Sequence, residues 1–279
     1  MKLDKISNIE CFVFDMDGTV YLEDILLDGA LDMFNYFNEN NIPYYFLTNN
    51  SSKSGKSYLR KLHSLSMRFV KRDQIITSGD ITIKYVKEQF GKNKIPKIYL
   101  VGTDELKQDF VKEGIHIIEG DNEEIDAVVV GFDTSLTYEK VSIATRYIRK
   151  GIPFISTHID LVCPIKNGEF IPDCGAITKM IEASTGVKAK YLGKPNKETV
   201  DYLVDTIKID KRKIAIVGDR LYTDVATGIN NGMIGIAVLT GETSLTEIEK
   251  SSIKPSYVFK DVSQLHKLYM NKTEVECFV

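Results

Sequence analysis

Cysteine is scarce in this sequence, and the cysteines present follow no recognisable pairing pattern. The four of them, Cys11, Cys163, Cys174 and Cys277, include no Cys-x-x-Cys pair and no spacing typical of a disulfide framework. Cys11 lies in an apolar run, where a thiol behaves as a small hydrophobic side chain. Cysteine use of this kind is typical of a reducing compartment, and we expect a cytoplasmic protein.

Long apolar runs and an excess of positive charge are also missing. No run approaches the roughly 18 apolar residues that a membrane span needs. Residues 1–10 mix charges and lack the apolar stretch of a signal peptide. The 36 Lys and Arg against 39 Asp and Glu give a formal net charge of −3, which offers no basic surface for nucleic acid. We therefore expect neither a membrane nor a nucleic-acid partner.

Short apolar runs alternate with amphipathic stretches along the whole chain. This alternation is typical of a parallel sheet flanked by helices, and it predicts an α/β fold with a doubly wound parallel sheet. Expected strands are 11–14, 43–47, 97–101, 127–132, 154–157, 214–217, 234–239 and 257–259. Expected helices are 29–40, 54–65, 104–113, 138–150, 176–184 and 197–207.

The polar clusters that could carry chemistry are confined to two stretches, near residues 15–50 and near 194–224. The residues between these stretches form a self-contained pattern of strands and helices with no obvious catalytic cluster. We therefore predict a core formed by residues 1–78 and 189–279, with residues 79–188 inserted as a second α/β domain.

The first cluster follows the apolar run at 11–14 and contains Asp15, Asp17 and Gly18. Ligands of open α/β sheets bind at the carboxyl ends of strands, and residues two apart in extended backbone face the same way. Two neighbouring carboxylates stay ionised only when a cation or hydrogen bonds offset their repulsion. Oxygen ligands with room for water favour Mg²⁺. Gly18 allows a tight turn whose amides can approach an anion.

Three further clusters complete the parts that phosphoryl transfer needs. Asp219 follows the strand predicted at 214–217 and adds a carboxylate to the metal site. Thr48, Asn49 and Asn50 follow the strand predicted at 43–47 and supply neutral donors for phosphate oxygens. Lys194, between a glycine and a proline, supplies one positive charge.

These four clusters, taken in their order along the chain, resemble the four signatures of the haloacid dehalogenase-like (HAD) hydrolase superfamily. The first is Asp15-Met16-Asp17-Gly18-Thr19, and the others contain Thr48-Asn49-Asn50, Gly193-Lys194-Pro195 and 218–224. The pattern is most similar to the NagD-like and p-nitrophenyl phosphatase branch and covers nearly the whole chain, including the stretch 239–243. The resemblance implies a Rossmann-like core and a type II α/β cap at 79–188, which would restrict substrates to small molecules.

The resemblance also implies a role for each site residue. Asp15 would be the nucleophile that becomes an aspartyl-phosphate, and Asp17 the general acid and base. The metal ligands would be Asp15, the backbone carbonyl of Asp17, and Asp219. Asp224 would support these ligands without binding the metal itself, although its direct contact with the metal is left open. The phosphate-binding residues would be Gly18, Thr48, Asn49, Asn50 and Lys194.

The function expected from these roles is Mg²⁺-dependent hydrolysis of a small organic phosphate monoester. Two alternatives remain: a phosphotransferase or phosphomutase using the same aspartyl-phosphate, and a non-catalytic protein that binds phosphorylated metabolites. Phosphoglycolate, nucleotide monophosphates, sugar phosphates and pyridoxal phosphate all stay open as substrates. A homodimer formed through the cap is a further possibility implied by the resemblance.

Two positions in the cap region depart from the resembling branch. The branch usually has Asn where this chain has His158, and Gly where it has Asp173. His158 and Asp160 could therefore determine substrate specificity, or they could serve the hydrogen bonding of their own loop.

Overall fold

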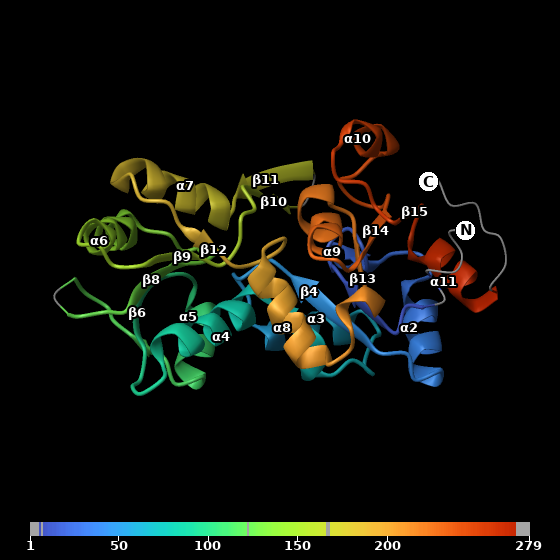
Figure 1. Cartoon of the computed structure of the whole chain (residues 1–279), viewed down its shortest axis with the longest axis horizontal. Coiled ribbons are helices and arrows are strands. Elements are labelled where there is room, and N and C mark those ends of the chain that lie inside the picture. The colour runs from blue at the N-terminus through green and yellow to red at the C-terminus, as the bar shows by residue number, and fades with distance from the viewer. Residues whose placement is uncertain (1–5, 7, 122, 166–167, 272–279) are drawn as a thin grey trace. The chain divides into compact units, whose positions relative to one another are not determined.

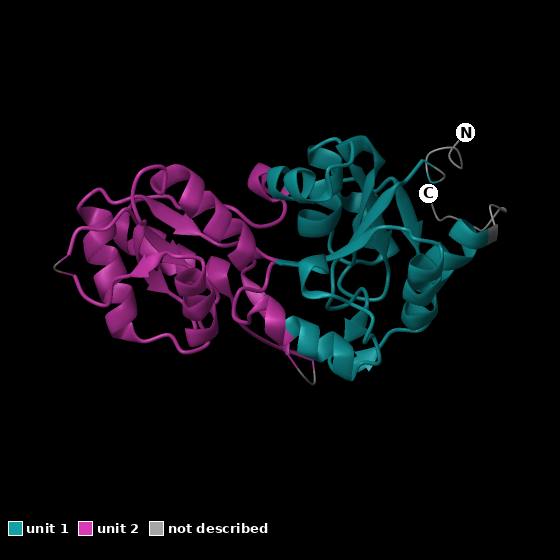
Figure 2. Ribbon diagram, turned by 90° about the horizontal axis from the view of Figure 1, so that it is seen from below, with its two compact units in different colours: residues 1–48, 58–76, 200–279 teal, residues 49–57, 77–199 magenta. Residues whose placement is uncertain are grey.

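The computed structural model describes residues 6, 8–121, 123–165 and 168–271. The chain divides into two compact units, shown in teal and magenta in Figure 2. Unit 1 comprises Met1–Thr48, Tyr58–Ile76 and Val200–Val279, and unit 2 comprises Asn49–Ser57 and Thr77–Thr199. The predicted division into a core and a cap places its boundaries at other residues and stays a prediction.

Unit 1 is built on a six-stranded sheet with the order β15-β14-β13-β1-β4-β5, labelled in part in Figure 1. Its strands are β1 (Cys11–Phe14), β4 (Tyr44–Thr48), β5 (Ile75–Thr77), β13 (Ile214–Gly218), β14 (Ile234–Val238) and β15 (Tyr257–Phe259). The pairs β1–β4, β1–β13, β13–β14 and β14–β15 are parallel. From β1 the chain builds outward to one side through β4, and the later strands fill the other side from β13. The strand order therefore reverses between β1 and β13, which is where open α/β sheets bind ligands.

Helices and short turns surround this sheet. They are α2 (Ala30–Glu39), α3 (Gly55–Ser64), α8 (Lys197–Ile207), α9 (Ala226–Asn230), α10 (Leu245–Lys250), α11 (Val262–Asn271), η1 (Arg72–Gln74), η3 (Lys211–Lys213) and the π-helical turn η4 (Leu221–Val225). Helices α3 and α8 begin in unit 2 and continue into unit 1. A short hairpin, β2 (Tyr21–Leu22) and β3 (Ile25–Leu26), follows β1.

An aromatic layer packs β1 against α2. Phe14 of β1 meets Phe34 edge-on with ring centroids 5.0 Å apart, and Phe12 stacks on Phe37 at 5.1 Å. Helix α2 presents these rings because its apolar residues recur at helical spacing, and α11 packs beside it (Figure 1). Burying each Phe side chain contributes about 1.5–3 kcal/mol. This layer therefore fixes β1, and the residue that follows it, at the centre of the sheet.

Unit 2 has its own five-stranded sheet, with the order β12-β9-β8-β6-β7 and parallel pairing throughout. The strands are β6 (Lys97–Val101), β7 (His116–Ile117), β8 (Ala127–Val130), β9 (Phe154–Ser156) and β12 (Lys190–Tyr191). Its helices are α4 (Ser78–Phe90), α5 (Asp104–Lys112), α6 (Tyr138–Arg149) and α7 (Cys174–Thr185), of which α6 packs beside α7 (Figure 1). An antiparallel hairpin, β10 (Val162–Ile165) and β11 (Glu169–Pro172), precedes α7.

The helices of unit 2 begin at side chains that accept their first free amides. Thr77 caps α4 in a capping box with Asp80, Thr103 caps α5, Thr137 caps α6, and Asp173 caps α7. Each such cap is typically worth about 1 kcal/mol. Asp173 thus has a local structural role at the start of α7.

The α/β fold with a doubly wound parallel sheet is confirmed, and every strand predicted from an apolar run is present. The strand expected at 127–132 ends at Val130, and the helix expected at 176–184 begins at Cys174. Among the described residues, no helix combines the length and apolarity needed to cross a bilayer. Cys11, Cys163 and Cys174 form no disulfide among the described residues, and Cys277 lies outside them.

Candidate active site

Three carboxylates meet where β1 and β13 end in unit 1. Asp15 directly follows β1, and Asp219 directly follows β13, the parallel neighbour in which Val217 pairs with Phe14. The amide of Asp15 donates a hydrogen bond to the carbonyl of Val217 at 2.8 Å. One carboxylate oxygen each from Asp15, Asp219 and Asp224 lies within 4.8 Å of the others. The sheet register therefore produces the acidic cluster.

Asp224 reaches this cluster from the π-helical turn η4, in which it is fully buried. Its Oδ2 accepts a hydrogen bond from the amide of Arg220 at 3.1 Å. A Cβ atom on Gly218 would lie 2.3 Å from the Cβ of Asp224, so only glycine fits at the end of β13. Single π-helical turns occur often at functional sites, and this one turns a carboxylate back toward the strand that it follows.

Asp219 is 3 % exposed and uses its two oxygens differently. Its Oδ2 accepts the amide of Glu242 at 2.8 Å, whereas its buried Oδ1 has no hydrogen-bond partner among the described residues. Burial, followed by the neighbouring charge of Asp224, raises the pKa of Asp219 to about 7, against the lowering effects of the Glu242 amide and Arg220. A buried carboxylate oxygen without a donor, beside two further carboxylates, fits a divalent cation.

A loop after β14 covers Asp219 so closely that it requires glycine. A Cβ atom on Gly241 would lie 1.9 Å from Asp219 Oδ2, and one on Gly18, whose φ is +79°, would lie 2.6 Å from the same atom. The hydroxyl of Thr240 donates to the carbonyl of Gly18 at 2.6 Å. The stretch 239–243 is part of the family resemblance, but no role was predicted for it. The feature that could have predicted a role is a glycine in a polar segment directly after a strand.

We expect Gly241→Ala to weaken both the cation site and the fold. The added methyl group must displace the loop and with it the Glu242 amide, and overpacking of this kind costs about 1–3 kcal/mol. Thermal unfolding and a Mg²⁺ titration measure the two effects. Gly120→Ala is the matched control, because a Cβ atom there has nothing within 4 Å. Equal Mg²⁺ affinity in wild type and Gly241→Ala would show that the loop does not shape the site.

The side chain of Asp17 lies apart from the carboxylate cluster. Its Oδ2 accepts the hydroxyl of Tyr21 at 3.3 Å, and its Oδ1 lies 3.7 Å from Lys61 Nζ of α3. Lys61 also sits 3.8 Å above the Tyr21 ring. The chain turns at Gly18, whose amide bonds to the carbonyl of Tyr21, and this turn brings Tyr21 beside Asp17. Neither Tyr21 nor Lys61 was predicted as a site residue, because no local sequence pattern indicated them.

Thr48 and the asparagines after it are placed by β4 and the turn that follows. Thr48, the last residue of β4, is buried beside β1 in the sheet of unit 1. Asn50 Oδ1 accepts the amide and the hydroxyl of Ser52, at 2.9 and 2.7 Å, and so stabilises the turn. The phosphate-binding roles of these residues stay predictions.

In unit 2, Asn49 and Lys194 bind each other. Asn49 Oδ1 accepts the amide of Lys194 at 2.8 Å, and Asn49 Nδ2 donates to the carbonyl of Lys194 at 3.2 Å. Gly193 makes this approach possible, since a Cβ atom there would lie 2.7 Å from Asn49 Oδ1. Lys194 is 2 % exposed. Two sequence clusters separated by 145 positions are therefore joined by two side-chain atoms of Asn49 and the backbone of Lys194.

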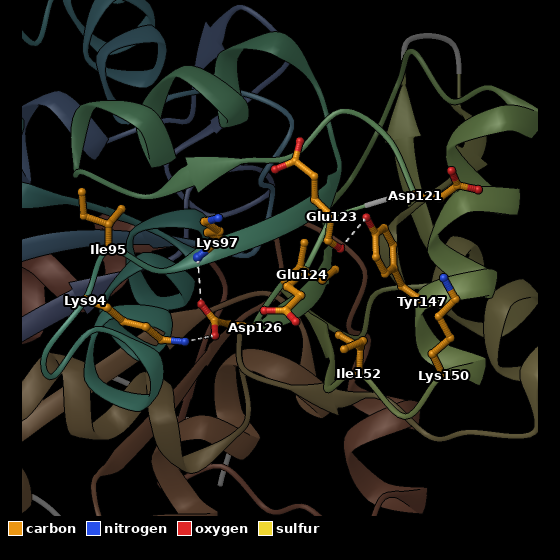
Figure 3. Close-up of a pocket in the computed structure, with 11 residues that line it drawn as sticks. Lys94, Ile95, Lys97, Asp121, Glu123, Glu124, Asp126, Tyr147, Lys150 and Ile152 are labelled. Atoms are coloured by element: carbon orange, nitrogen blue, oxygen red, sulfur yellow. Dashed lines mark hydrogen bonds and ion pairs between the residues drawn. The ribbon is translucent and has the colours of Figure 1, made fainter.

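A large open cavity lies elsewhere in unit 2. It has a volume of about 1030 Å³ and is lined by residues at the amino ends of β6 and β8, among them Lys97, Asp126 and Ile152 (Figure 3). Asp126 bonds there to Lys94 and to the backbone amide of Lys97. None of the residues predicted for the active site lines it. Because ligands of parallel sheets bind at the opposite, carboxyl ends, we place the site at the carboxylates instead.

Comparison with known proteins identifies the family of this chain. Residues 12–116 match the family described as haloacid dehalogenase-like hydrolase, and residues 191–265 match a family described as HAD-hydrolase-like. The acid sugar phosphatase of Staphylococcus haemolyticus is 35 % identical over 94 % of this chain and 98 % of its own length. The 4-nitrophenylphosphatase of Thermotoga maritima is 43 % identical, with a TM-score of 0.89 over 95 % of this chain and 99 % of that one. NagD from E. coli K-12 is 26 % identical, with a TM-score of 0.82 over 91 % and 97 %.

The chain therefore belongs to the haloacid dehalogenase-like hydrolases. Within that family it is a phosphatase of the branch that contains NagD and the p-nitrophenyl phosphatases. The resemblance that the four sequence clusters indicated is confirmed.

Proposed function

We propose that this protein hydrolyses small organic phosphate monoesters in a Mg²⁺-dependent reaction, through an aspartyl-phosphate formed on Asp15. The observation that carries this proposal is the cluster of Asp15, Asp219 and Asp224, with the buried Asp219 Oδ1 left without a donor. Oxygen-only ligation favours Mg²⁺ among the common divalent ions. The ion would be held by Asp15, Asp219 and the backbone carbonyl of Asp17. Asp224 would orient Asp219 without binding the ion itself.

In the first step a carboxylate oxygen of Asp15 attacks phosphorus, and the bond from phosphorus to the alcohol oxygen breaks. Asp17 donates its proton to that oxygen, so the alcohol leaves neutral. In the second step Asp17 takes a proton from water, whose oxygen attacks the same phosphorus. Inorganic phosphate leaves and the Asp15 carboxylate is restored. When bound, Mg²⁺ neutralises charge on the phosphoryl oxygens and on Asp15.

The remaining residues would bind the phosphoryl group. Gly18, through its backbone, and Thr48, Asn49 and Asn50 supply donors, and Lys194 supplies positive charge. Electrostatic stabilisation of this kind is usually the largest contribution to such a reaction. Two steps with an enzyme carboxylate as nucleophile replace one slow displacement by water.

A phosphate-release screen tests the substrate class. The names of the relatives direct the choice of compounds: sugar phosphates and p-nitrophenyl phosphate, together with phosphoglycolate, nucleotide monophosphates and pyridoxal phosphate. We expect free phosphate from several small monoesters with Mg²⁺ and none after chelation with EDTA. Positional isomers of a sugar phosphate without free phosphate would identify a mutase instead. Binding without turnover of any compound would identify a sensor of phosphorylated metabolites.

Two properties of the whole protein belong to the same proposal. We place it in the cytoplasm, on the basis of the cysteine pattern, and we propose a homodimer formed through residues 79–188. Light scattering coupled to size exclusion measures the oligomeric state. A monomeric mass at micromolar concentration would contradict the dimer.

A further inference from the structure

A fully buried histidine in unit 2 lies between two buried carboxylates. His158 exposes none of its side chain, and Asp160 and Asp173 are each 3 % exposed. His158 Nδ1 is 3.4 Å from Asp160 Oδ2, and His158 Nε2 is 3.4 Å from Asp173 Oδ1. The side chain is therefore enclosed by protein and faces two carboxylates, and a role of His158 and Asp160 in substrate specificity stays a prediction.

One ligand atom from each of His158, Asp160 and Asp173 lies within 4.8 Å of the others, close enough to share a metal ion. The two carboxylates nevertheless face opposite ring nitrogens, an arrangement that suits a charged imidazolium. Burial lowers the pKa of His158, but Asp173, Cys174 and Asp160 raise it, and the net result is a pKa of about 9. A protonated His158 then places one positive charge between the two buried carboxylates at neutral pH.

Asp160 connects the His158 imidazole to the pair formed by Asn49 and Lys194. Asp160 Oδ2, the oxygen that faces His158, also accepts Asn49 Nδ2 at 3.1 Å. The same amide nitrogen bonds to the carbonyl of Lys194, and Asn49 Oδ1 accepts the amide of Lys194. A continuous chain of contacts thus runs from His158 through Asp160 and Asn49 to Lys194.

On the other side, Asp173 ties His158 to the start of α7. Its Oδ1 accepts the amide of Cys174 at 2.5 Å, and the amide of Gly175 donates to the carbonyl of Asp160 at 2.7 Å. A Cβ atom on Gly175 would lie 2.2 Å from the carbonyl oxygen of Ile159, so the loop and the helix are in close backbone contact. The helix is a rigid support for the loop that carries His158.

The two departures from the resembling branch, His158 and Asp173, are in direct contact with each other. The positive charge of His158 and the negative charge of Asp173 stabilise each other at this short distance.

We infer that His158 is a positioning residue, which holds Asp160, and through it Asn49 and Lys194, in the arrangement that binds phosphate. This inference rests on the proposed function, in which Asn49 and Lys194 bind the phosphoryl group. His158 itself touches no substrate.

The test compares inorganic phosphate binding, by calorimetry with Mg²⁺, in wild type and in His158→Gln. Glutamine keeps a donor but removes the positive charge that His158 places between the two carboxylates. We expect the Kd for phosphate and the KM for p-nitrophenyl phosphate to rise about tenfold, the loss that one charge-assisted hydrogen bond produces. The kcat should change less than KM. His116→Gln, at an exposed position in the same unit, is the matched control.

A second variant separates positioning from general loss of structure. His158→Gln combined with Asp173→Asn removes the surplus negative charge and keeps an oxygen to cap α7, so phosphate affinity should recover to within about threefold of wild type. Phosphate affinity of the wild type should also weaken as the pH rises through about 9, and this step should be missing in His158→Gln.

Equal phosphate affinity in wild type and His158→Gln would overturn the inference. A metal ion that is bound stoichiometrically by the wild type and is lost in His158→Gln would also overturn it. A weakened affinity that the double variant does not restore would also overturn it. A failure of the proposed function would give a different experimental result. In that case the wild type itself would release no phosphate from any ester, whereas the effect of His158 would still be measured by phosphate binding.

Discussion

We expect Asp15→Asn to abolish turnover and to leave the fold intact. Because the carboxamide has nearly the shape of the carboxylate but cannot attack phosphorus, we expect kcat to fall by at least about 10⁴-fold. The free energy of unfolding without metal should stay equal or rise, since one of three clustered negative charges is removed. Phosphate release from p-nitrophenyl phosphate and thermal unfolding measure the two effects.

Asp28→Asn is the matched control for this substitution. Asp28 lies on the surface of the same unit and outside the cluster, so its replacement should leave kcat unchanged. Residual turnover in Asp15→Asn above a few per cent of wild type, in protein shown by mass spectrometry not to have deamidated back to aspartate at this position, would exclude Asp15 as the nucleophile.

Removing the metal makes the stability of the protein depend on pH between about 4 and 7. The pKa of Asp219 is raised from 3.8 to about 7 in the folded protein, so in this range the folded state binds more protons than the unfolded state. The contribution of Asp219 to the free energy of unfolding of the metal-free protein is therefore largest below pH 4. It falls by up to about 4 kcal/mol as the pH rises to 7. On the proposed function Mg²⁺ would replace the proton, and at 100 times its Kd we expect it to restore about 2.7 kcal/mol at pH 7.

Thermal unfolding at pH 5 and pH 7.5, with EDTA and with Mg²⁺, measures this linkage. We expect stabilisation by Mg²⁺ at pH 7.5 and little at pH 5, where protonated Asp219 does not bind the ion. Asp219→Asn should lose both the response to Mg²⁺ and the pH dependence. Equal stabilisation by Mg²⁺ in wild type and Asp219→Asn would place the ion elsewhere.

The fold and half of the site could be predicted because their signals are local. Strands such as β1 and β8 are buried along their whole length and appear as continuous apolar runs. Asp15 and Asp219 stand directly after such runs, so the parallel order of strands was enough to expect them together. The hairpin β10–β11 was missed because its residues are largely exposed and alternate without a clear apolar face.

The parts that could not be predicted depend on contacts between distant segments. The turn at Gly18 directs Asp17 toward Tyr21 and Lys61, although residues two apart in an extended strand would share a face. The close approach of Gly241 to Asp219 joins two strand ends of the sheet in unit 1. No sequence pattern links these positions, because each contact is set by the packing of the sheet.

Borohydride trapping during turnover tests the central claim most directly. Borohydride reduces an aspartyl-phosphate to homoserine, which mass spectrometry of the digested protein locates at a single residue. The account predicts homoserine at Asp15, formed only when substrate and Mg²⁺ are both present. Reduction at another carboxylate, or none at all while phosphate release continues, would contradict it.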